Sequence, residues 1–343
     1  LILSLIFLFT GCTDKTITRI YLEKNSKKMT AGNIIFSSDI IGAVGDMTVK
    51  GDLIIFIDHH PSSATCFYVV NKTTGELENS FGKRGRGPEE YLQPTIVRNE
   101  KHYNQDNLLD VYDMGTNTAN TLDLTNPKEI CRILNSEIKA PNEVYGMKFI
   151  NRIGDEIMGQ VAIQTEDATW LKFVNINDAK VQNKIPYFNS ELVIKTGASF
   201  IFDTHVYVSA LSNKIITGMS FFDYINILNR NGELLKRYQF GETPLPQLDD
   251  KGTISKYIVY THLSYSSPNY CYFLRYGTDM NRPDFDDTGM TLIKLDWNGN
   301  FVDSYSIEHF LYGFCVDEQN GVLYGVITNR ETGTVSIREY KGL

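Results

Sequence analysis

Short runs of alternating apolar and polar residues follow one another along the chain, and tight turns separate them. Alternation with a period of two predicts β-strands, and a Gly-containing dipeptide between two such runs predicts a hairpin. The clearest hairpins lie at 67–81, 225–240 and 292–307, turning at Thr74-Gly75, Asn231-Gly232 and Asn298-Gly299; weaker copies lie at 119–134, 171–188 and 322–340. Six copies of one unit predict an all-β fold, a six-bladed β-propeller of four-stranded antiparallel blades.

The spacing of these runs divides the chain into six blades. We expect them at 44–81, 96–134, 144–188, 200–240, 257–307 and from residue 310 onward. The last blade ends with the run from Ser336 to Tyr340 and lacks a fourth strand of its own. Asn33 to Phe36 can supply that strand, which would close the ring and cover an edge prone to pairing with other chains. No long run has a period of 3.6 residues, so almost no helix is expected.

Composition and charge narrow the class further. The chain has 343 residues and a formal net charge of −8, which argues against a nucleic-acid partner, because such proteins present a basic face to phosphate. Repeated units bury their faces against their neighbours, so a single propeller domain is expected despite the length. Four cysteines within strand-like runs lack C-x-x-C spacing and are expected to be buried free thiols: Cys66, Cys131, Cys271 and Cys315.

The N-terminal residues have the character of an export signal. Leu1 to Gly11 are apolar or small, carry no charge and lead directly into Cys12. The run is too short to span a bilayer, and Phe9-Thr10-Gly11-Cys12 resembles a bacterial lipobox, whose Cys is lipidated. A leader cleaved elsewhere, with an incidental Cys, is the alternative. We predict a partial signal peptide over 1–11, a lipidated Cys12 with a polar tether over 12–32, and the propeller over 33–343.

Strand order decides which connections share a face. In a blade with strands a to d from the channel outward, the b–c and d–a connections lie on one face, and the a–b and c–d connections lie on the other. Turns assigned to the second face are tight, with 99–106 as the main exception. The long connections fall on the first face, at 59–65, 82–94, 163–168, 241–256 and 277–290. Because extra loop length is usually functional or disordered, we predict that this long-loop face binds the partner.

The connection after the first blade combines glycines with basic residues and reads Gly82-Lys83-Arg84-Gly85-Arg86-Gly87-Pro88-Glu89-Glu90-Tyr91. Glycines permit close backbone approach, but neither a Walker Lys nor a predicted helix follows. Two interpretations stay open: an anion contact at the channel mouth, or a stiff connector in which Glu89 and Glu90 pair with neighbouring Arg residues. The candidate ligand-binding residues on this face are Lys83, Arg84, Arg86, Glu89, Tyr91 and His59.

The same connection resembles the G-x-x-G-x-G-P-x-E-[YF] segment of the six-bladed β-propeller lipoproteins of Bacteroidetes, a TolB-like group. The lipobox, the polar tether, Asp39-Ile40-Ile41 and the first blade extend the resemblance, whereas later blades match only as generic repeats. The resemblance implies a periplasmic or outer-membrane location and a non-enzymatic binding role. Carrying over the protein partners of TolB-type propellers would rest on fold analogy alone.

Patterns for metal binding are incomplete. His59 and His60 are adjacent on an extended segment, so their side chains point in opposite directions and cannot easily chelate one metal. Asp284-x-Asp286-x-Thr288-Gly289 imitates the start of a calcium loop, yet Leu295 stands where the closing Glu belongs. Asp284, Asp286 and Asp287 are therefore candidates only for weak calcium binding, with a solvated acidic loop as the alternative, and we expect no cofactor.

Patterns for catalysis are also incomplete. Gly218-Met219-Ser220-Phe221-Phe222 departs from the G-x-S-x-G elbow at its last glycine. His205 and His262 are expected on inner strands, where they either line the channel or are satisfied core histidines, and Trp297 is expected at a c–d turn, away from the long-loop face. None of these residue patterns predicts a specific reaction.

Two functions remain in competition. The first is a lipid-anchored, non-enzymatic binding protein of the cell envelope, at the outer membrane, that recognises a protein or glycan partner through the long-loop face. The alternative is a metal-dependent propeller hydrolase or lactonase with its site at the central channel. The sequence favours the first, because inner strands such as 44–49 and 310–316 carry few groups that could hold a metal; Asp46 and Glu143 are exceptions.

Overall fold

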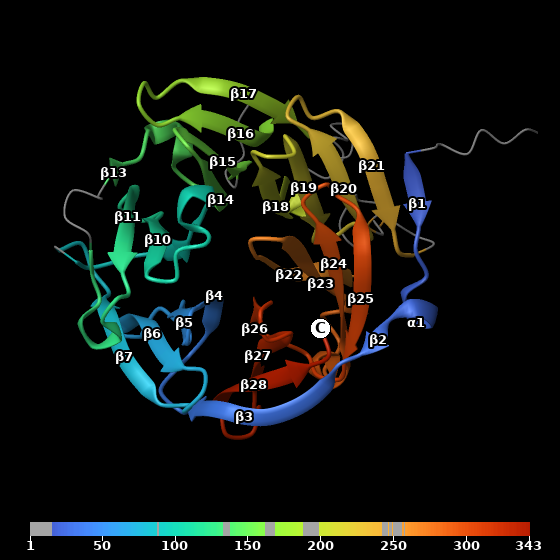
Figure 1. Cartoon of the computed structure of the whole chain (residues 1–343). Helices are drawn as coiled ribbons and strands as arrows, with labels where there is room; N and C mark the ends of the chain where they lie inside the picture. Colours follow the sequence, from blue (N-terminus) through green and yellow to red (C-terminus); the bar gives the residue numbers. More distant parts are fainter. Residues whose placement is uncertain are drawn as a thin grey trace, which may run out of the picture.

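The computed structural model describes residues 16–87, 89–132, 138–161, 169–187, 199–241 and 258–343, together with residues 246, 249 and 256. Within these ranges, six β-sheets stand around a central channel (Figure 1), which confirms the predicted all-β six-bladed propeller. Helix in the described ranges is limited to α1 (Leu22–Asn25) and short 3₁₀ turns, η1 (Glu100–His102), η2 (Pro127–Glu129), η3 (Asn142–Val144), η4 (Ser199–Phe202) and η5 (Phe285–Asp287). None of these helices is long and apolar enough to cross a membrane.

The first three blades follow the predicted order from the channel outward. Blade 1 contains β4 (Val44–Lys50), β5 (Leu53–Asp58), β6 (Thr65–Asn71) and β7 (Leu77–Lys83). Blade 2 contains β8 (Pro94–Ile96), β10 (Leu108–Asp113), β11 (Thr118–Asp123) and two short outer strands, β12 (Cys131–Arg132) and β13 (Ile138–Lys139). Blade 3 contains β14 (Met147–Ile153), β15 (Glu156–Val161), β16 (Thr169–Asn175) and β17 (Val181–Pro186). Between them, β9 (Arg98–Asn99) leaves blade 2 and pairs in parallel with β14.

The last three blades complete the ring. Blade 4 contains β18 (Thr204–Ser209), β19 (Lys214–Met219), β20 (Tyr224–Asn229) and β21 (Leu234–Gln239). Blade 5 contains β22 (Ile258–Ser266), β23 (Tyr270–Asp279), β24 (Met290–Asp296) and β25 (Phe301–Ile307). Blade 6 contains β26 (Gly313–Asp317), β27 (Val322–Thr328) and β28 (Val335–Lys341), so the hairpin predicted at 322–340 joins its second and third strands.

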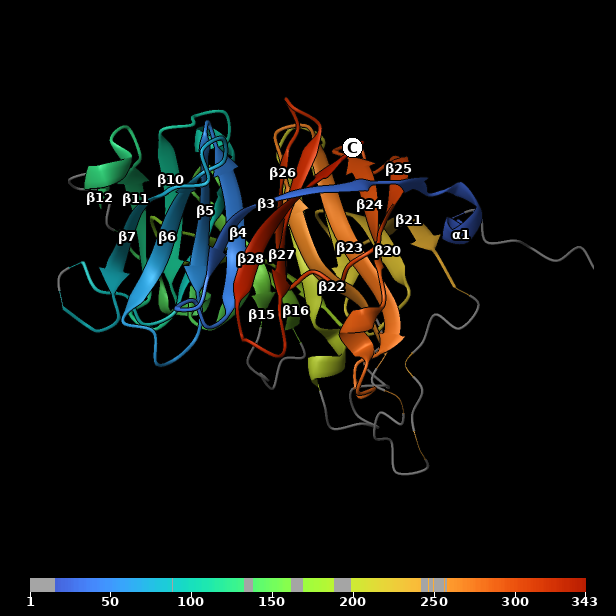
Figure 2. The same cartoon turned by 90° about the horizontal axis from the view of Figure 1, so that it is seen from below.

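The fourth strand of blade 6 comes from the other end of the chain. β3 (Thr30–Ser38) pairs antiparallel with β28, and Phe36 lies opposite Ile337. Figure 2 shows β3 running across the outside of the ring beside β28. This arrangement confirms the predicted closure by an N-terminal strand, and the strand extends beyond the predicted 33–36 at both ends. The outer edge of β28 is thereby covered by backbone hydrogen bonds.

The residues before β3 pack against the outside of the ring. β1 (Ile17–Arg19) pairs in parallel with β21, and β2 (Lys27–Lys28) pairs in parallel with β25, so each adds a fifth strand to its blade. The segment predicted as a polar tether therefore contains two short strands that pair with the outer edges of the ring through their backbone. Cys12 and the predicted signal peptide over 1–11 lie outside the described residues.

Apolar side chains from neighbouring sheets fill the seams between blades. All four residues from Ile54 to Ile57 on β5 are buried, as expected for a strand covered on both faces. Phe67 of blade 1 stacks on Phe81 at 4.8 Å between ring centroids and meets Tyr91 edge-on at 5.0 Å. Burying one such ring contributes about 1.5–3 kcal/mol. The thiols of Cys66, Cys271 and Cys315 are free and buried, as predicted, whereas the side chain of Cys131 lies outside the described set.

Short polar side chains fix the turns. At the end of the third strand of blades 1 to 5, an Asn or Asp side chain accepts hydrogen bonds from backbone N–H groups two to four residues later, at Asn71, Asp123, Asn175, Asn229 and Asp296. Such side chains mimic a backbone turn, and the three clearest hairpins of the sequence, at 67–81, 225–240 and 292–307, are among these five. In blade 6, the hairpin from the third to the fourth strand cannot form, because the chain supplies the fourth strand from its N-terminal part.

Candidate functional site

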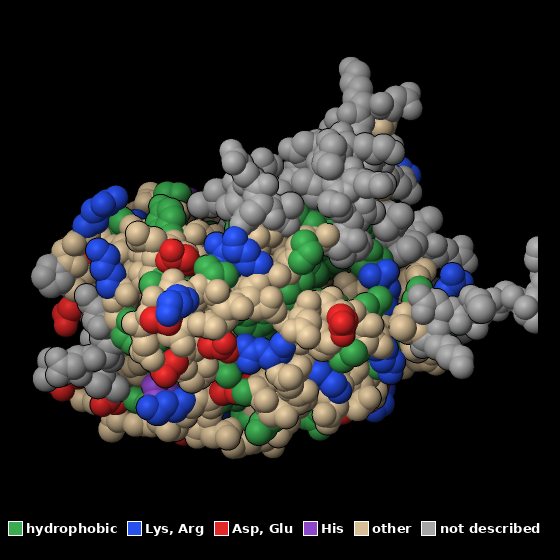
Figure 3. All heavy atoms as spheres, turned by 90° about the horizontal axis from the view of Figure 1, so that it is seen from above, with side chains coloured by type: hydrophobic (Ala, Val, Ile, Leu, Met, Phe, Trp, Pro, Cys, Tyr) green, Lys and Arg blue, Asp and Glu red, His purple; other side chains and the backbone are tan. Residues whose placement is uncertain are grey.

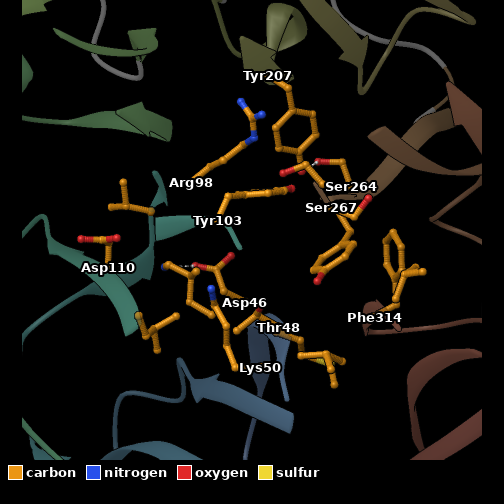
Figure 4. A pocket seen from close by; sticks show the side chains of 18 of the residues that line it. Asp46, Thr48, Lys50, Arg98, Tyr103, Asp110, Tyr207, Ser264, Ser267 and Phe314 are labelled. Atoms are coloured by element: carbon orange, nitrogen blue, oxygen red, sulfur yellow. Dashed lines mark hydrogen bonds between the residues drawn. The ribbon is translucent and has the colours of Figure 1, made fainter. Parts of the chain in front are cut away.

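The inner strands of the six blades enclose a cavity of about 980 Å³. Its wall combines aromatic, hydroxyl, imidazole and charged side chains from all six blades, including Asp46, Lys50, Tyr207, Ser264 and Phe314 (Figure 4). The volume lies at the upper end of the range of about 300–1,000 Å³ that is usual for ligand pockets. The channel is therefore large enough for a ligand or for an extended part of one.

The charged groups of the cavity wall, apart from the exposed Asp106, are held by other protein groups. Lys50 donates to the carbonyl oxygens of His102 and Gln105 at 3.1 and 3.0 Å, and burial lowers the pKa of its ammonium. Three carboxylates lie beside basic side chains: Asp317 is 2.7 Å from Lys72, Asp110 is 2.7 Å from His102, and Asp203 is 3.0 Å from Lys148. Asp46 accepts a hydrogen bond from the backbone N–H of Ile96 at 3.0 Å. Glu318 accepts hydrogen bonds from Asn269 and Tyr272 at 3.0 and 2.9 Å. These pairings leave little uncommitted charge for a ligand.

Arg98 reaches across the channel from blade 2. Its guanidinium donates to the carbonyl oxygen of Val208 in blade 4 and lies 3.7 Å from the ring centroid of Trp297 in blade 5. Only 9% of its side chain is exposed. Glu100, two residues later, accepts from the backbone N–H of Ala210 at 2.9 Å. The segment 98–107 therefore joins blade 2 to the opposite side of the ring, and we call it the cross-ring connection.

Tyr103 of the cross-ring connection extends into the cavity. Figure 4 shows its ring between Arg98 and Asp46, pointing toward Ser264 and Ser267. The guanidinium carbon of Arg98 lies 5.0 Å from the ring centroid. Burial raises the pKa of the Tyr103 phenol, and its hydroxyl is buried with no hydrogen-bond partner of acceptable geometry among the described groups. A buried hydroxyl of this kind costs free energy and is available to a ligand or a water molecule.

Two imidazoles, those of His205 and His262, also line the cavity. Nδ1 of His205 is 2.8 Å from the hydroxyl oxygen of Ser264, which is 2.7 Å from that of Tyr207. Burial lowers the pKa of His205 and of His262 to about 4, so both rings are neutral at pH 7. Phe149 packs on His205, with ring centroids 4.3 Å apart, and Phe310 packs on His262 at 4.8 Å. The histidines that the sequence left open between channel and core thus line the channel.

Phe149 owes its position to an unusual backbone. Its φ is +51°, and it lies where the pairing of β14 with β15 shifts register between Lys148 and Asn151. A positive φ is a genuine outlier for a bulky residue, and bulges often re-aim a side chain. Here the bulge directs an aromatic ring onto His205. Strain held at a cavity wall is a mark of a functional region.

The connection that the sequence singled out, 84–93, lies on the opposite face from the cross-ring connection. Arg84 donates to the carbonyl oxygens of Ser63, Leu92 and Asp58 at 3.2, 2.7 and 3.0 Å, so its donors are used by the fold. Tyr91 is buried against Phe67, and the backbone N–H of Gly87 donates to the carboxylate of Glu90 at 2.6 Å. These contacts fix the connection locally through backbone groups, and they are not the pairing of Glu89 and Glu90 with Arg residues that the stiff-connector interpretation expected.

The other four predicted residues are exposed on the long-loop face. Lys83, Arg86 and His59 all present their side chains to solvent, as does Glu89, which has a φ of +61°. Strand order and Figure 2 place these positions on the same side of the ring as η5 and the acidic residues of blade 5. The cavity wall includes none of the six predicted ligand-binding residues, so their role stays a prediction.

The acidic loop of blade 5 is occupied by local contacts. Asp284 pairs with Arg282 at 2.6 Å, and Asp279 accepts the backbone N–H of Asn281 at 3.0 Å; Asp287 is exposed, and the side chain of Asp286 lies outside the described set. Within the described residues, no three His, Cys, Asp or Glu side chains are grouped so that they could hold a metal. On the side of the ring shown in Figure 3, acidic and basic side chains are interspersed.

Comparison with known proteins agrees with this geometry. The sequence pattern of the family described as "TolB-like 6-blade propeller-like" matches residues 24–319. The chain belongs to this TolB-like family. No curated protein matches it significantly.

Two solved structures resemble this TolB-like propeller over nearly their whole length. A member of the DUF4221 family from Bacteroides vulgatus has a TM-score of 0.60 at 10% identity, covering 92% of this chain and 98% of its own. A Bacteroides fragilis protein named "putative exported protein" has a TM-score of 0.54 at 11% identity, covering 95% and 99%. At these identities, the likeness shows the fold alone.

The sequence gave only a partial indication of the channel site. The length of 99–106 marked it as the exception among the tight turns, which was the available signal for the cross-ring connection. Nothing local distinguishes Arg98, because its partners Val208 and Trp297 are more than one hundred residues away in the chain, and the position of Tyr103 follows from that of Arg98, which lies over its ring. Asp46 lines the channel as suspected, whereas the cavity wall does not include Glu143.

Proposed function

We propose that this TolB-like propeller is a non-enzymatic binding protein of the cell envelope, lipid-anchored at Cys12, that recognises a protein or glycan partner through its long-loop face. The proposal extends the "putative exported protein" of Bacteroides fragilis to this chain by analogy. It also uses the apolar run that ends at Gly11-Cys12.

The observation that carries the proposal is the unequal length of the connections on the two faces. On the long-loop face, β7 and β8 are joined by 84–93, and β23 and β24 by 280–289. On the other face, β4 and β5 are joined by 51–52, and β14 and β15 by 154–155. A propeller needs only tight turns to close its hairpins, so the extra residues are available for recognition. Lys83, Arg86 and His59 offer exposed donors on this face.

The anchor would hold the ring close to the bilayer. β1 begins at Ile17, so five peptide steps separate it from Cys12. An extended chain of that length spans at most about 18 Å. A lipidated Cys12 would therefore keep the outer edge of blade 4 beside the membrane. Replacing Cys12 by Ser should move the protein from the membrane to the soluble fraction, whereas an unmodified N-terminus upstream of Cys12 in cells would contradict the anchor.

The binding face can be tested with two matched double variants. Lys83→Ala/Arg86→Ala removes two exposed cations from the long-loop face, and Lys180→Ala/Lys341→Ala removes two exposed cations from the opposite face. Capture of the partner from a solubilised envelope fraction should fall for the first variant and stay unchanged for the second. For an acidic partner, the loss should be larger at 50 mM than at 300 mM salt, because salt screens exposed charges. Equal capture by both variants at both salt concentrations would reject the role of this face.

A further inference from the structure

We infer that the central cavity binds a neutral, hydroxyl-rich ligand, and that this ligand is the end of an uncharged glycan. The inference rests on the proposed function, which leaves open whether the partner is a protein or a glycan. It deepens that function by choosing the glycan and placing its end in the channel. It depends on three features of the described cavity wall: the state of its charges, its polar atoms, and its aromatic rings.

The charges of the wall argue against a charged ligand. Arg98 and Lys50 donate to backbone carbonyl oxygens of Val208, His102 and Gln105. Glu318 and Asp46 accept hydrogen bonds from neighbouring side chains or backbone groups. A carboxylate or phosphate moved into this cavity would lose its hydration without gaining an uncommitted cation, and an ammonium would find only the exposed carboxylate of Asp106. A peptide terminus is disfavoured for the same reason.

The polar atoms of the wall are suited to hydroxyl groups. Nδ1 of His205 is engaged with Ser264, and no described group forms a hydrogen bond with its Nε2. The imidazole of His262 has no hydrogen-bond partner among the described residues and faces the cavity. A neutral imidazole offers one donor and one acceptor, which matches a hydroxyl group that can serve as either. The hydroxyl of Tyr103, buried without a partner, adds a third such group.

The aromatic rings supply apolar surfaces beside these polar atoms. Phe149 lines the cavity and packs on His205. Phe310 is buried outside the wall and supports it from behind, contacting the rings of His262 and Tyr312 at 4.8 and 5.1 Å between ring centroids. Phe314 and Tyr265 also line the cavity, and their ring centroids are 6.1 Å apart. Ligand pockets generally combine apolar walls with a few placed polar groups. A sugar ring has C–H faces and an equatorial rim of hydroxyls, so it complements both kinds of surface at once, and the cavity of about 980 Å³ can take more than one ring.

The experiment uses the whole protein and a panel of neutral oligosaccharides, with acidic oligosaccharides and an uncharged, blocked peptide as comparison probes. Binding is measured by isothermal titration calorimetry for the wild type, for His262→Leu and for His309→Leu. His262→Leu keeps an apolar side chain but removes both ring nitrogens. His309→Leu makes the same substitution at a partly exposed histidine that is not part of the cavity wall and serves as the matched control.

We expect a neutral oligosaccharide to bind, His262→Leu to weaken its binding about tenfold, and His309→Leu to leave its binding unchanged. Loss of one hydrogen bond to the ligand is sufficient for a tenfold change. Tyr103→Phe, which keeps the ring, should also weaken binding while leaving the melting temperature equal or higher. The inference is overturned if only acidic oligosaccharides or only the peptide bind, if no probe binds at millimolar concentration, or if His262→Leu binds like the wild type.

The two proposals fail in different ways. If Lys83→Ala/Arg86→Ala loses the envelope partner while neutral oligosaccharides do not bind, the face is correct and the channel assignment is wrong. If neutral oligosaccharides bind in a His262-dependent manner while Lys83→Ala/Arg86→Ala captures the envelope partner normally, the channel is correct and the long-loop face is wrong.

Discussion

The connections 84–93 and 98–107 lie on opposite faces of the ring, and they use their arginines differently. Arg84 donates three hydrogen bonds to carbonyl oxygens of blade 1 and of its own connection. Arg98 donates to blade 4 and packs on Trp297 of blade 5. The connection 84–93 is thus held by neighbouring backbone, and we call it the brace. The cross-ring connection, 98–107, links blades on different sides of the channel, and we call it the strut. Loop length and basic residues predict neither role, because each depends on where the guanidinium finds its acceptors.

The two connections also differ in where they place their side chains. The brace leaves Lys83 and Arg86 in solvent, where our proposal has them meet the partner. The strut instead brings Tyr103 into the cavity. Residues from the face with tight turns thus contribute to the wall of the channel, together with the inner strands of the six blades.

Removing residues up to Phe36 should have the largest effect on stability, because it opens the ring that the strut spans. The truncation deletes most of β3 and exposes β28 along its edge. We expect loss of cooperative unfolding and self-association, measured by circular dichroism melting and size-exclusion chromatography. Removing residues only up to Tyr21 deletes β1 and should keep a cooperative transition. Equal melting temperatures for the two truncations would show that β3 does not close the ring.

Arg98→Ala should destabilise the protein by about 3 kcal/mol, because it removes a desolvated cation–π contact and a charged hydrogen bond. Urea unfolding measures the loss. Hydrogen exchange should rise in β18 of blade 4 and in the 297–300 turn of blade 5, far from the substituted residue in sequence. Lys101→Ala, which removes an exposed cation of the same connection, should change stability by no more than about 0.5 kcal/mol. A loss below 1 kcal/mol, or exchange confined to blade 2, would reject the strut.

Acid should lower the free energy of unfolding through the two histidines that line the cavity. Burial holds the pKa of His205 and His262 at about 4, below the value of about 6.5 expected in the unfolded chain. Their contribution is therefore complete above pH 6.5 and is lost as the pH falls toward 4, because the unfolded chain binds the protons first. Between pH 7.5 and 5, we expect a loss on the order of 2 kcal/mol for each imidazole.

The His205→Gln/His262→Gln variant isolates this contribution. Its free energy of unfolding should depend less on pH between 7.5 and 5 than that of the wild type, as measured by urea titrations at each pH. Burial also lowers the pKa of His309, so part of the dependence remains in the variant. Parallel curves for the variant and the wild type would show that the channel histidines do not titrate in this way.

Arg84→Ala should destabilise by about 2 kcal/mol, the smallest of the four effects, since three carbonyl oxygens lose a charged donor but some regain water. The change in hydrogen exchange should stay within the connections 59–64 and 84–93. Arg86→Ala is the matched control, because Arg86 is exposed in the same connection, and its stability should equal that of the wild type. Equal stability of both variants would mean that Arg84 does not brace the connection.

Much of the fold could be predicted from local pattern. The third strand of each of blades 1 to 5 ends in an Asn or Asp whose side chain closes the turn. A short segment such as Asn71 to Gly75 is therefore sufficient to predict a hairpin. Closure by an N-terminal strand followed from the strand missing after Tyr340. The edge strands β1 and β2 were missed, because parallel pairing at an outer edge demands no alternation of apolar residues.

The candidate site could be predicted only in part. His205 and His262 were placed on inner strands by their position within a blade, but their neutral state depends on burial beside Phe149 and Phe310. Arg84 was chosen for its charge and proved to be held by Ser63, Asp58 and Leu92. A charge in the sequence shows that a donor exists, and only its surroundings show whether that donor is free.

The sequence by itself determined the all-β class, the number of blades, their turns and the strand that closes the ring. These properties depend on contacts between segments that adjoin in the chain, or on one strand left without a partner, so pattern and turn chemistry are sufficient. The tertiary structure alone decided that Arg98 crosses to Val208 and Trp297, that Tyr103 extends into the cavity, and that the imidazoles stay neutral. Those outcomes require six inner strands, distant in sequence, to converge around one channel, and that convergence sets which charges are paired and which groups lose water.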